Sequence, residues 1–140
     1  MLTRMCAGGV VFQDDKVFIL KNDKNEWVLP KGVVRNKETA YEVALKRVKH
    51  EGGVEAEVIF PAGETNYEFY SQTRKTPVCN KIDWFIMKAD CPEVTVNTDE
   101  GFTEGGFFKI DDALEKITYS QDRSLVRLAH KKYEKYCQNK

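Results

Sequence analysis

Charged side chains recur at helical spacing between residues 46 and 51. Lys46, Arg47, His50 and Glu51 all fall in this stretch, and Arg47 and Glu51 are four residues apart. Residues three or four apart share one side of a helix, so Arg47, His50 and Glu51 would lie side by side. A carboxylate there can bind a cation or accept a proton, and an arginine can hold a carboxylate or a phosphate. Arg47 therefore has two interpretations: an ion pair with Glu51, or a direct phosphate contact.

The element that positions these residues is a helix, which we expect from Glu38 to Glu51. Acidic residues gather at its start and basic residues at its end, as the helix dipole favours, and Gly52 and Gly53 end it. A stripe of small and branched apolar residues repeats at helical spacing, which predicts a buried face: Ala40, Val43, Ala44 and Val48.

The segments around this helix are rich in strand patterns. Residues 7–12 and 16–20 predict a hairpin, and Gly8 and Gly9 within it indicate a bulge or a close backbone approach. We expect an ordered loop at 27–34, strands at 54–63, 65–72, 78–89 and 105–110, a loop at 91–100, and an Asp-capped helical turn at 111–117. The strand at 78–89 has an apolar centre typical of a central strand.

A closing helix is expected from Gln121 to Tyr136. Its predicted buried face consists of Leu125, Leu128, Ala129, Tyr133 and Tyr136. The order of elements predicts a mixed β-sheet sandwiched between helices, an α/β (α+β) fold, in one domain over residues 1–140.

Composition narrows the classes of partner. The 22 basic and 22 acidic residues cancel, so nothing calls for bulk DNA as a partner, and no apolar run approaches the ~20 residues of a membrane helix. The four cysteines form no C-x-x-C pair, which argues against a zinc site. No leader pattern is visible at the start of the chain. We expect reduced thiols and a cytoplasmic protein.

The helix and its flanks together resemble a known family. Gly32, five residues, Glu38, seven residues and "KRVKHEGGV" resemble the Nudix box, G-x5-E-x7-R-E-U-x-E-E-x-G-U, where U is aliphatic. The positions that match in register are Gly32, Glu38, Val48, Glu51, Gly53 and Val54, and Lys46 replaces the arginine. The flanks "CAGGVVF", "WVLPKG" and "EGGFFKIDDAL" resemble the family too. "ETNY" with "KIDWFIMKA" looks like its diadenosine polyphosphate hydrolase branch.

The resemblance implies a Nudix (MutT-like) fold and hydrolysis of a nucleoside diphosphate linked to another group, with Mg²⁺ or Mn²⁺ held by glutamates. Arg47 and His50 stand at two of the three usual glutamate positions, and only Glu51 matches. At ~5 Å, an arginine would repel a divalent cation by roughly 7 kcal/mol at an effective dielectric of about 20. The implied metal site is therefore weakened or altered, with Glu51, His50 and Glu100 as candidate ligands.

The resemblance also assigns roles to other residues. Glu51 and Glu104 are the candidate catalytic carboxylates, since Glu104 fits the late family segment better than Glu100. The candidate substrate-binding residues are Lys31, Gly32, Lys46, Arg47, Tyr67 and Arg4. Gly32 would permit a tight turn before the helix. Tyr67 would stack on a base or simply pack on the sheet, and Lys31 and Arg4 would contact phosphate or lie solvated.

These observations lead to one main hypothesis and two alternatives. The main hypothesis is a hydrolase that cleaves a pyrophosphate bond in a nucleotide or dinucleoside polyphosphate through a weakened or altered metal site. The first alternative is a non-catalytic protein of the same fold that binds a nucleotide or an RNA end. The second is a protein-interaction module, because one fold supports many functions.

Overall fold

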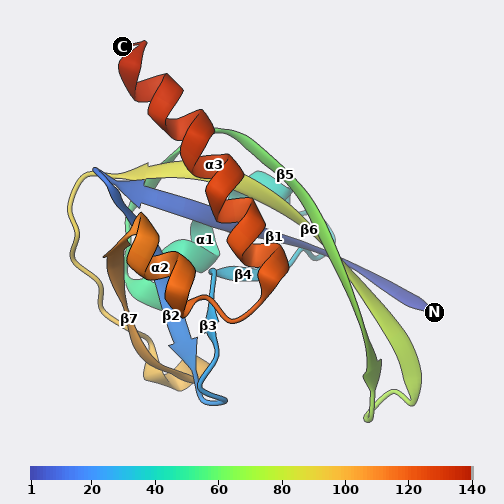
Figure 1. Ribbon diagram of the computed structural model, residues 1–140. Helices are drawn as coiled ribbons and strands as arrows, with labels where there is room; N and C mark the ends of the chain where they lie inside the picture. Colours follow the sequence, from blue (N-terminus) through green and yellow to red (C-terminus); the bar gives the residue numbers. More distant parts are fainter. Residues whose placement is uncertain (140) are drawn as a thin grey trace.

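The computed structural model of the protein describes residues 1–139, and its centre is a seven-stranded sheet (Figure 1). The strands are β1 (Leu2–Gln13), β2 (Lys16–Asn22), β3 (Trp27–Val28), β4 (Lys31–Val33), β5 (Ala56–Ser71), β6 (Thr76–Ala89) and β7 (Phe102–Lys109). Their order is β3-β2-β1-β6-β5, with β4 paired to β1 and β7 paired to β2. Only β1 and β6 run parallel among the strands of this described part, so the sheet is mixed, as predicted.

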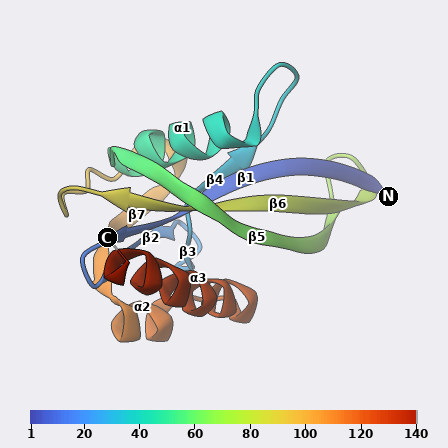
Figure 2. The same ribbon diagram turned by 90° about the horizontal axis from the view of Figure 1, so that it is seen from above.

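Helices cover both faces of this sheet. The helices are α1 (Ala40–Gly52), α2 (Ile110–Lys116), α3 (Ser120–Gln138) and the short 3-10 turn η1 (Thr98–Glu100). Figure 2 shows α1 on one side of the sheet and α2 and α3 on the other. Neighbouring residues of β1 alternate between two apolar cores, with Val10 and Phe12 packed under α3 and Ala7 and Val11 under α1. This alternation follows from the two-residue repeat of a strand, and the predicted sandwich is confirmed.

The predicted first hairpin is confirmed, with Phe12 opposite Val17. Gly8 lets the backbone at Pro30 approach β1 closely, because a Cβ at this position would lie 2.5 Å from the carbonyl oxygen of Pro30. The register between β1 and β6 continues without a shift past Gly8, so the sequence feature marks a close backbone contact and no bulge.

Two of the predicted boundaries are wrong. The stretch 27–34 is two short strands, β3 and β4, because the carbonyl oxygen of Pro30 accepts a hydrogen bond from the Gly9 amide at 3.1 Å and ties the segment to β1. The strands expected at 54–63 and 65–72 are one strand, β5, whose pairing with β6 continues past register shifts near Phe60 and Pro61.

The helices differ from expectation in two details. The Asp cap predicted for the turn at 111–117 is wrong, because α2 begins at Ile110 and the residue before it, Lys109, makes no side-chain cap. Asp111 and Asp112 lie in the first turn, where they complement the helix dipole. On α3, Leu128 is 59% exposed while Val126 is buried. A 3.6-residue repeat places Val126 beside Ala129 and Tyr133 and turns Leu128 away. The rest of the predicted α3 face packs in or against the apolar core.

Two smaller expectations concern membrane spans and cysteines. Within residues 1–139, no helix is long and apolar enough to cross a membrane. The four cysteines are free thiols, with Cys6 and Cys79 buried and Cys91 and Cys137 exposed, as the sequence predicts.

Candidate functional site

The helix that carries the charged residues is fixed at both ends by local interactions. The hydroxyl of Thr39 accepts a hydrogen bond from the Glu42 amide at 3.2 Å and caps the start of α1. Gly53 adopts a left-handed conformation, φ 64°, and ends the helix. The observed limits lie within two residues of the predicted ones. Val43 and Val48 of α1 are buried against the sheet, which sets the direction of the residues between them.

Glu51 is the buried member of the charged group. It is 2% exposed, and its Oε2 lies 2.8 Å from Nη2 and 2.9 Å from Nε of Arg47. Burial raises the pKa of Glu51 to about 7, although the charges of Arg47 and Lys31 act in the opposite direction. A carboxyl group with this pKa can both take up and release a proton near neutral pH.

Glu100 lies on the solvent side of the same cluster. Its Oε1 is 2.7 Å from Nε2 of His50, and its Oε2 is 3.3 Å from Nη2 of Arg47. The hydrogen bonds from His50 and then from Arg47 hold the pKa of Glu100 below its ordinary value. Arg47, His50, Glu51 and Glu100 therefore form one continuous group, which we call the box network.

The backbone before Glu100 is tied to the end of α1. The Thr95 amide donates to the Gly52 carbonyl at 2.8 Å, and the Asn97 amide donates to the Glu51 carbonyl at 2.9 Å. The Asn97 side chain also donates to the His50 carbonyl at 3.0 Å. These bonds satisfy carbonyl groups that the end of a helix leaves without partners, and they place η1 beside the box network.

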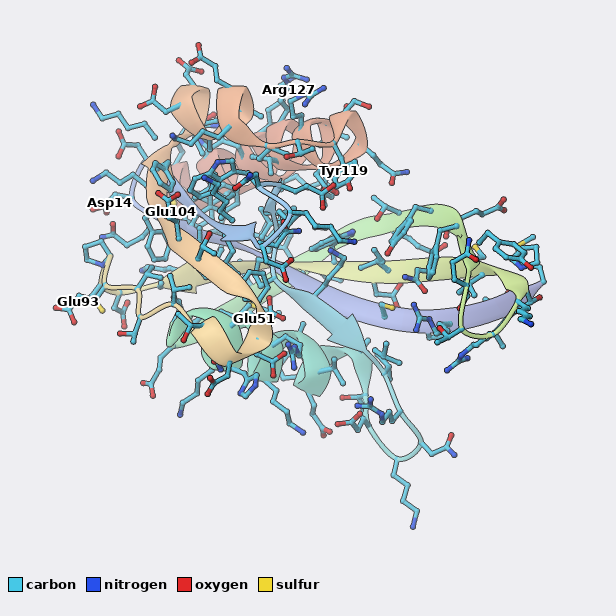
Figure 3. The ribbon with its side chains drawn as sticks, turned by 90° about the horizontal axis from the view of Figure 1, so that it is seen from below. Asp14, Glu51, Glu93, Glu104, Tyr119 and Arg127 are labelled. Atoms are coloured by element: carbon cyan, nitrogen blue, oxygen red, sulfur yellow. The ribbon has the colours of Figure 1, made fainter. Side chains whose placement is uncertain are left out.

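The structure brings Glu100 and not Glu104 to the end of α1. Glu104 lies on β7 and pairs with Lys21 of β2 at 3.0 Å. Figure 3 shows Glu51 where α1 meets the segment that contains η1, and Glu104 farther along β7. The sequence resemblance favoured Glu104. The signal for Glu100 was Asn97, whose side chain caps η1 by accepting from the Asp99 amide at 3.1 Å.

The donor set of the box network does not fit a divalent cation held by a glutamate cluster. Oε2 of Glu51 and Oε2 of Glu100 both already bind the guanidinium of Arg47. A guanidinium has no lone pair for a metal and keeps its proton. Among residues 1–139, no three or more His, Cys, Asp or Glu side chains are arranged to hold a metal ion.

Gly32 has a different role from the predicted one. It lies in β4, paired with Ala7, and has no left-handed backbone angle, so the expected tight turn is wrong. A Cβ at Gly32 would lie 2.6 Å from Cδ of Arg47. The absence of a side chain at this position therefore makes room for Arg47 to lie flat across β4 and reach Glu51.

Gly32→Ala should lower the free energy of unfolding by about 1–3 kcal/mol, because the new methyl group displaces a packed arginine stem. Urea unfolding of the single variants and of the Gly32→Ala/Arg47→Ala pair measures this cost. The methyl group should be nearly harmless once Arg47 is shortened. An equal penalty in both backgrounds would show that the clash is with something other than Arg47.

The two lysines expected to bind phosphate lie in different surroundings. Lys31 is on β4, where its charge acts on the pKa of both Glu51 and Asp122. Lys46 is 68% exposed in its side chain and pairs with Glu38 at 3.2 Å. The charge of Lys31 therefore acts on both Glu51 of α1 and Asp122 of α3, whereas Lys46 lies on the outer surface of α1.

Arg4 and Tyr67 lie on a part of the sheet that extends away from the helices, formed by the start of β1 and the β5–β6 hairpin (Figure 1). Nε of Arg4 donates to the buried Asn80 at 3.0 Å, and its guanidinium lies 5.6 Å from the ring centre of Phe69. Tyr67 also stacks on Phe69, with the two ring centres 5.6 Å apart. Sequence reasoning missed Phe69. Base stacking by Tyr67, which is 44% exposed, stays a prediction.

The chain resembles known proteins in both sequence and fold. A family model described as the NUDIX domain matches residues 2–129. A curated relative from Mycobacterium tuberculosis (strain CDC 1551 / Oshkosh), named "Putative mutator protein MutT4", is 26% identical over 109 residues. That match covers 78% of this chain and 43% of the relative, so the chain spans less than half of the relative's length.

Solved structures of similar fold include three with named substrates. A C. elegans Ap4A hydrolase in a binary complex superposes with a TM-score of 0.74 at 16% identity, covering 98% of this chain and 99% of that one. The E. coli dihydroneopterin triphosphate pyrophosphohydrolase gives 0.70 at 17% identity, covering 90% and 95%. An ADP-ribose pyrophosphatase from Streptococcus suis 89-1591 gives 0.68 at 19% identity, covering 90% and 88%. At such identities the likeness shows the fold.

Proposed function

The chain belongs to the NUDIX family, and from this premise we propose that it cleaves a pyrophosphate bond in a nucleotide or dinucleoside polyphosphate. Hydrolases of this family generally use divalent metal ions, and we propose that this member has a weakened and altered metal site. The names of the structural neighbours support the substrate class, because Ap4A, ADP-ribose and dihydroneopterin triphosphate all contain linked phosphates.

One observation carries the proposal: a buried carboxyl group with a pKa of about 7 touches a guanidinium within the matched box helix. In the proposed step, Glu51 takes a proton from water as the water oxygen bonds to phosphorus. The bond from phosphorus to the bridging oxygen breaks, and the electron pair leaves with the departing phosphate. Arg47 and Lys31 stabilise the charge on the phosphoryl oxygens.

The remaining candidate residues would contact parts of the substrate that are distant from the reacting bond. Lys46, which is exposed and pairs with Glu38, would contact a phosphate chain that follows α1 outward from the box network. Arg4 would contact phosphate, and Tyr67 offers its exposed ring to a base. Glu104 and its partner Lys21 lie on neighbouring strands, and a catalytic role for Glu104 has less support than one for Glu51.

Glu51→Gln should lower turnover by about 100-fold or more, because an amide of the same shape cannot accept the proton. Release of nucleotides from diadenosine tetraphosphate and ADP-ribose measures turnover, with Mg²⁺, with Mn²⁺ or with EDTA. Glu55→Gln is a matched control, since Glu55 pairs with Lys49 on the surface after the same helix. Turnover that survives Glu51→Gln unchanged would refute the assignment of the base.

A second candidate function is nucleotide or RNA-end binding without hydrolysis. The observation that favours it is the burial of Glu51 behind Arg47, which leaves its side chain 3% exposed. At that exposure, water reaches this carboxyl group only after a neighbouring side chain moves. Binding of the same nucleotides in EDTA, with no products after prolonged incubation, would select this function. Neither binding nor turnover would leave a protein-interaction module.

A further inference from the structure

The solvent side of the box network already holds an oxyanion. We propose that Arg47 and His50 form an anion site, that Glu100 occupies this site as an internal carboxylate, and that a phosphate group binds by displacing Glu100. The positions where the family resemblance expects metal-binding carboxylates would thus serve an anion in this chain. The identity of the ligand as a phosphate rests on the proposed function; the site itself rests on geometry.

Two nitrogen atoms converge on the two oxygens of Glu100. Nε2 of His50 lies 2.7 Å from Oε1, and Nη2 of Arg47 lies 3.3 Å from Oε2. Donors that bind carboxylate oxygens in this way also bind phosphate oxygens. The site is therefore built for an oxyanion, and the carboxylate of Glu100 has the shape and charge to imitate one.

The two carboxylates of the network differ in how readily they can be displaced. The side chain of Glu51 is 3% exposed and keeps two short contacts to Arg47. The side chains of His50 and Glu100 are 47% and 36% exposed. An ion pair at that exposure competes with water and is weak. Glu51 therefore fixes the orientation of Arg47 from the inside, while Glu100 is the member that an incoming anion can replace.

The backbone allows Glu100 to leave without disturbing the helix. The anchors to α1 are at Thr95 and Asn97, before η1, and Glu100 has no part in them. The next residue, Gly101, has φ 88°, a conformation that suits glycine. Rotation of the Glu100 side chain frees both basic groups while the bonds of Thr95 and Asn97 to α1 stay in place.

Binding of inorganic pyrophosphate in EDTA, measured by titration calorimetry, tests the proposal without any turnover. Glu100→Gln should bind pyrophosphate roughly three- to tenfold more tightly than the unsubstituted protein, because the competing charge is gone. Arg47→Met should lose the binding. Glu55→Gln removes the same charge near the end of α1 from an exposed pair, and its affinity should stay close to that of the unsubstituted protein.

Two results would overturn the inference: equal pyrophosphate affinity in Glu100→Gln and the unsubstituted protein, or equal tightening by Glu100→Gln and Glu55→Gln. The second result would mean that the net charge near the end of α1, and not the position of Glu100, determines the affinity for pyrophosphate. A failure of the proposed function can be distinguished from a failure of the anion-site inference. A protein without hydrolytic activity can still bind pyrophosphate more tightly when Glu100 is replaced by Gln. Conversely, turnover that depends on Glu51 can occur with no effect of Glu100 on pyrophosphate.

Discussion

The double variant Arg47→Glu/His50→Glu is expected to hydrolyse diadenosine tetraphosphate with Mn²⁺ about 100-fold faster than the unsubstituted protein, a difference of about 2.7 kcal/mol in the barrier. The substitution removes the guanidinium that binds Glu51 and Glu100. It places three carboxylates on one side of α1, where hard divalent cations find oxygen ligands. Gly32 leaves space beside the carboxylate introduced at position 47, because glycine has no side chain of its own.

The comparison needs a control for added negative charge. Lys49→Glu adds a carboxylate to the same helix at a residue that pairs with Glu55, outside the box network, and should leave turnover unchanged. Both rates are measured with Mg²⁺ and with Mn²⁺. If the unsubstituted protein already matches the double variant with Mg²⁺, the view that Arg47 and His50 weaken a metal site is wrong.

Arg47→Met is expected to lower the free energy of unfolding by about 3–5 kcal/mol at alkaline pH, because it leaves Glu51 as a buried carboxylate without its partner. Methionine preserves much of the stem that lies across Gly32, so lost packing contributes little. The loss should shrink on the acid side, where Glu51 is protonated and needs no counter-charge.

The direction of this pH dependence follows from the pKa of Glu51. Its value in the folded chain, about 7, lies above the ordinary 4.5, so the folded state binds the proton more tightly. The stabilisation from proton binding is complete below about pH 4.5 and is lost as the pH rises through about 7. Removal of Arg47 raises the pKa of Glu51 further and deepens the loss above neutrality.

Urea unfolding at about pH 5 and about pH 8.5 measures both effects. The matched control is Arg47→Met/Glu51→Gln, in which the buried group cannot ionise. Its stability should change little between the two pH values. A penalty for Arg47→Met that is the same at both would mean that Arg47 acts through packing and leaves the ionisation of Glu51 unaffected.

The sequence predicted the parts of the site that depend on local patterns. The limits of α1, its buried stripe and the pairing of Arg47 with Glu51 all follow from helical spacing and the residues at the helix ends. The mixed sheet between helices also follows from the order of the elements. Because the box positions sit within one helix, their relative placement needed no knowledge of distant contacts.

The parts that could not be predicted depend on contacts between distant segments. Glu100 reaches His50 only because backbone amides before η1 bind the carbonyl end of α1. Asn97 signals the short turn that contains Glu100, but the local sequence does not show that this turn packs against the end of α1. The role of Gly32 is of the same kind, because the group that needs the space is the side chain of Arg47 on another element.

In the proposed site, Arg47 and His50 bind an anion where the family has a metal site. A titration of the protein with Mn²⁺ in the absence of nucleotide, monitored by electron paramagnetic resonance, tests this difference. The two proteins to compare are the unsubstituted protein and Arg47→Glu/His50→Glu. The double variant should bind the ion at least about tenfold more tightly, because a guanidinium in the site repels a divalent cation and a carboxylate attracts it. Equal affinity of the two proteins for Mn²⁺ would contradict the replacement of the metal site by Arg47.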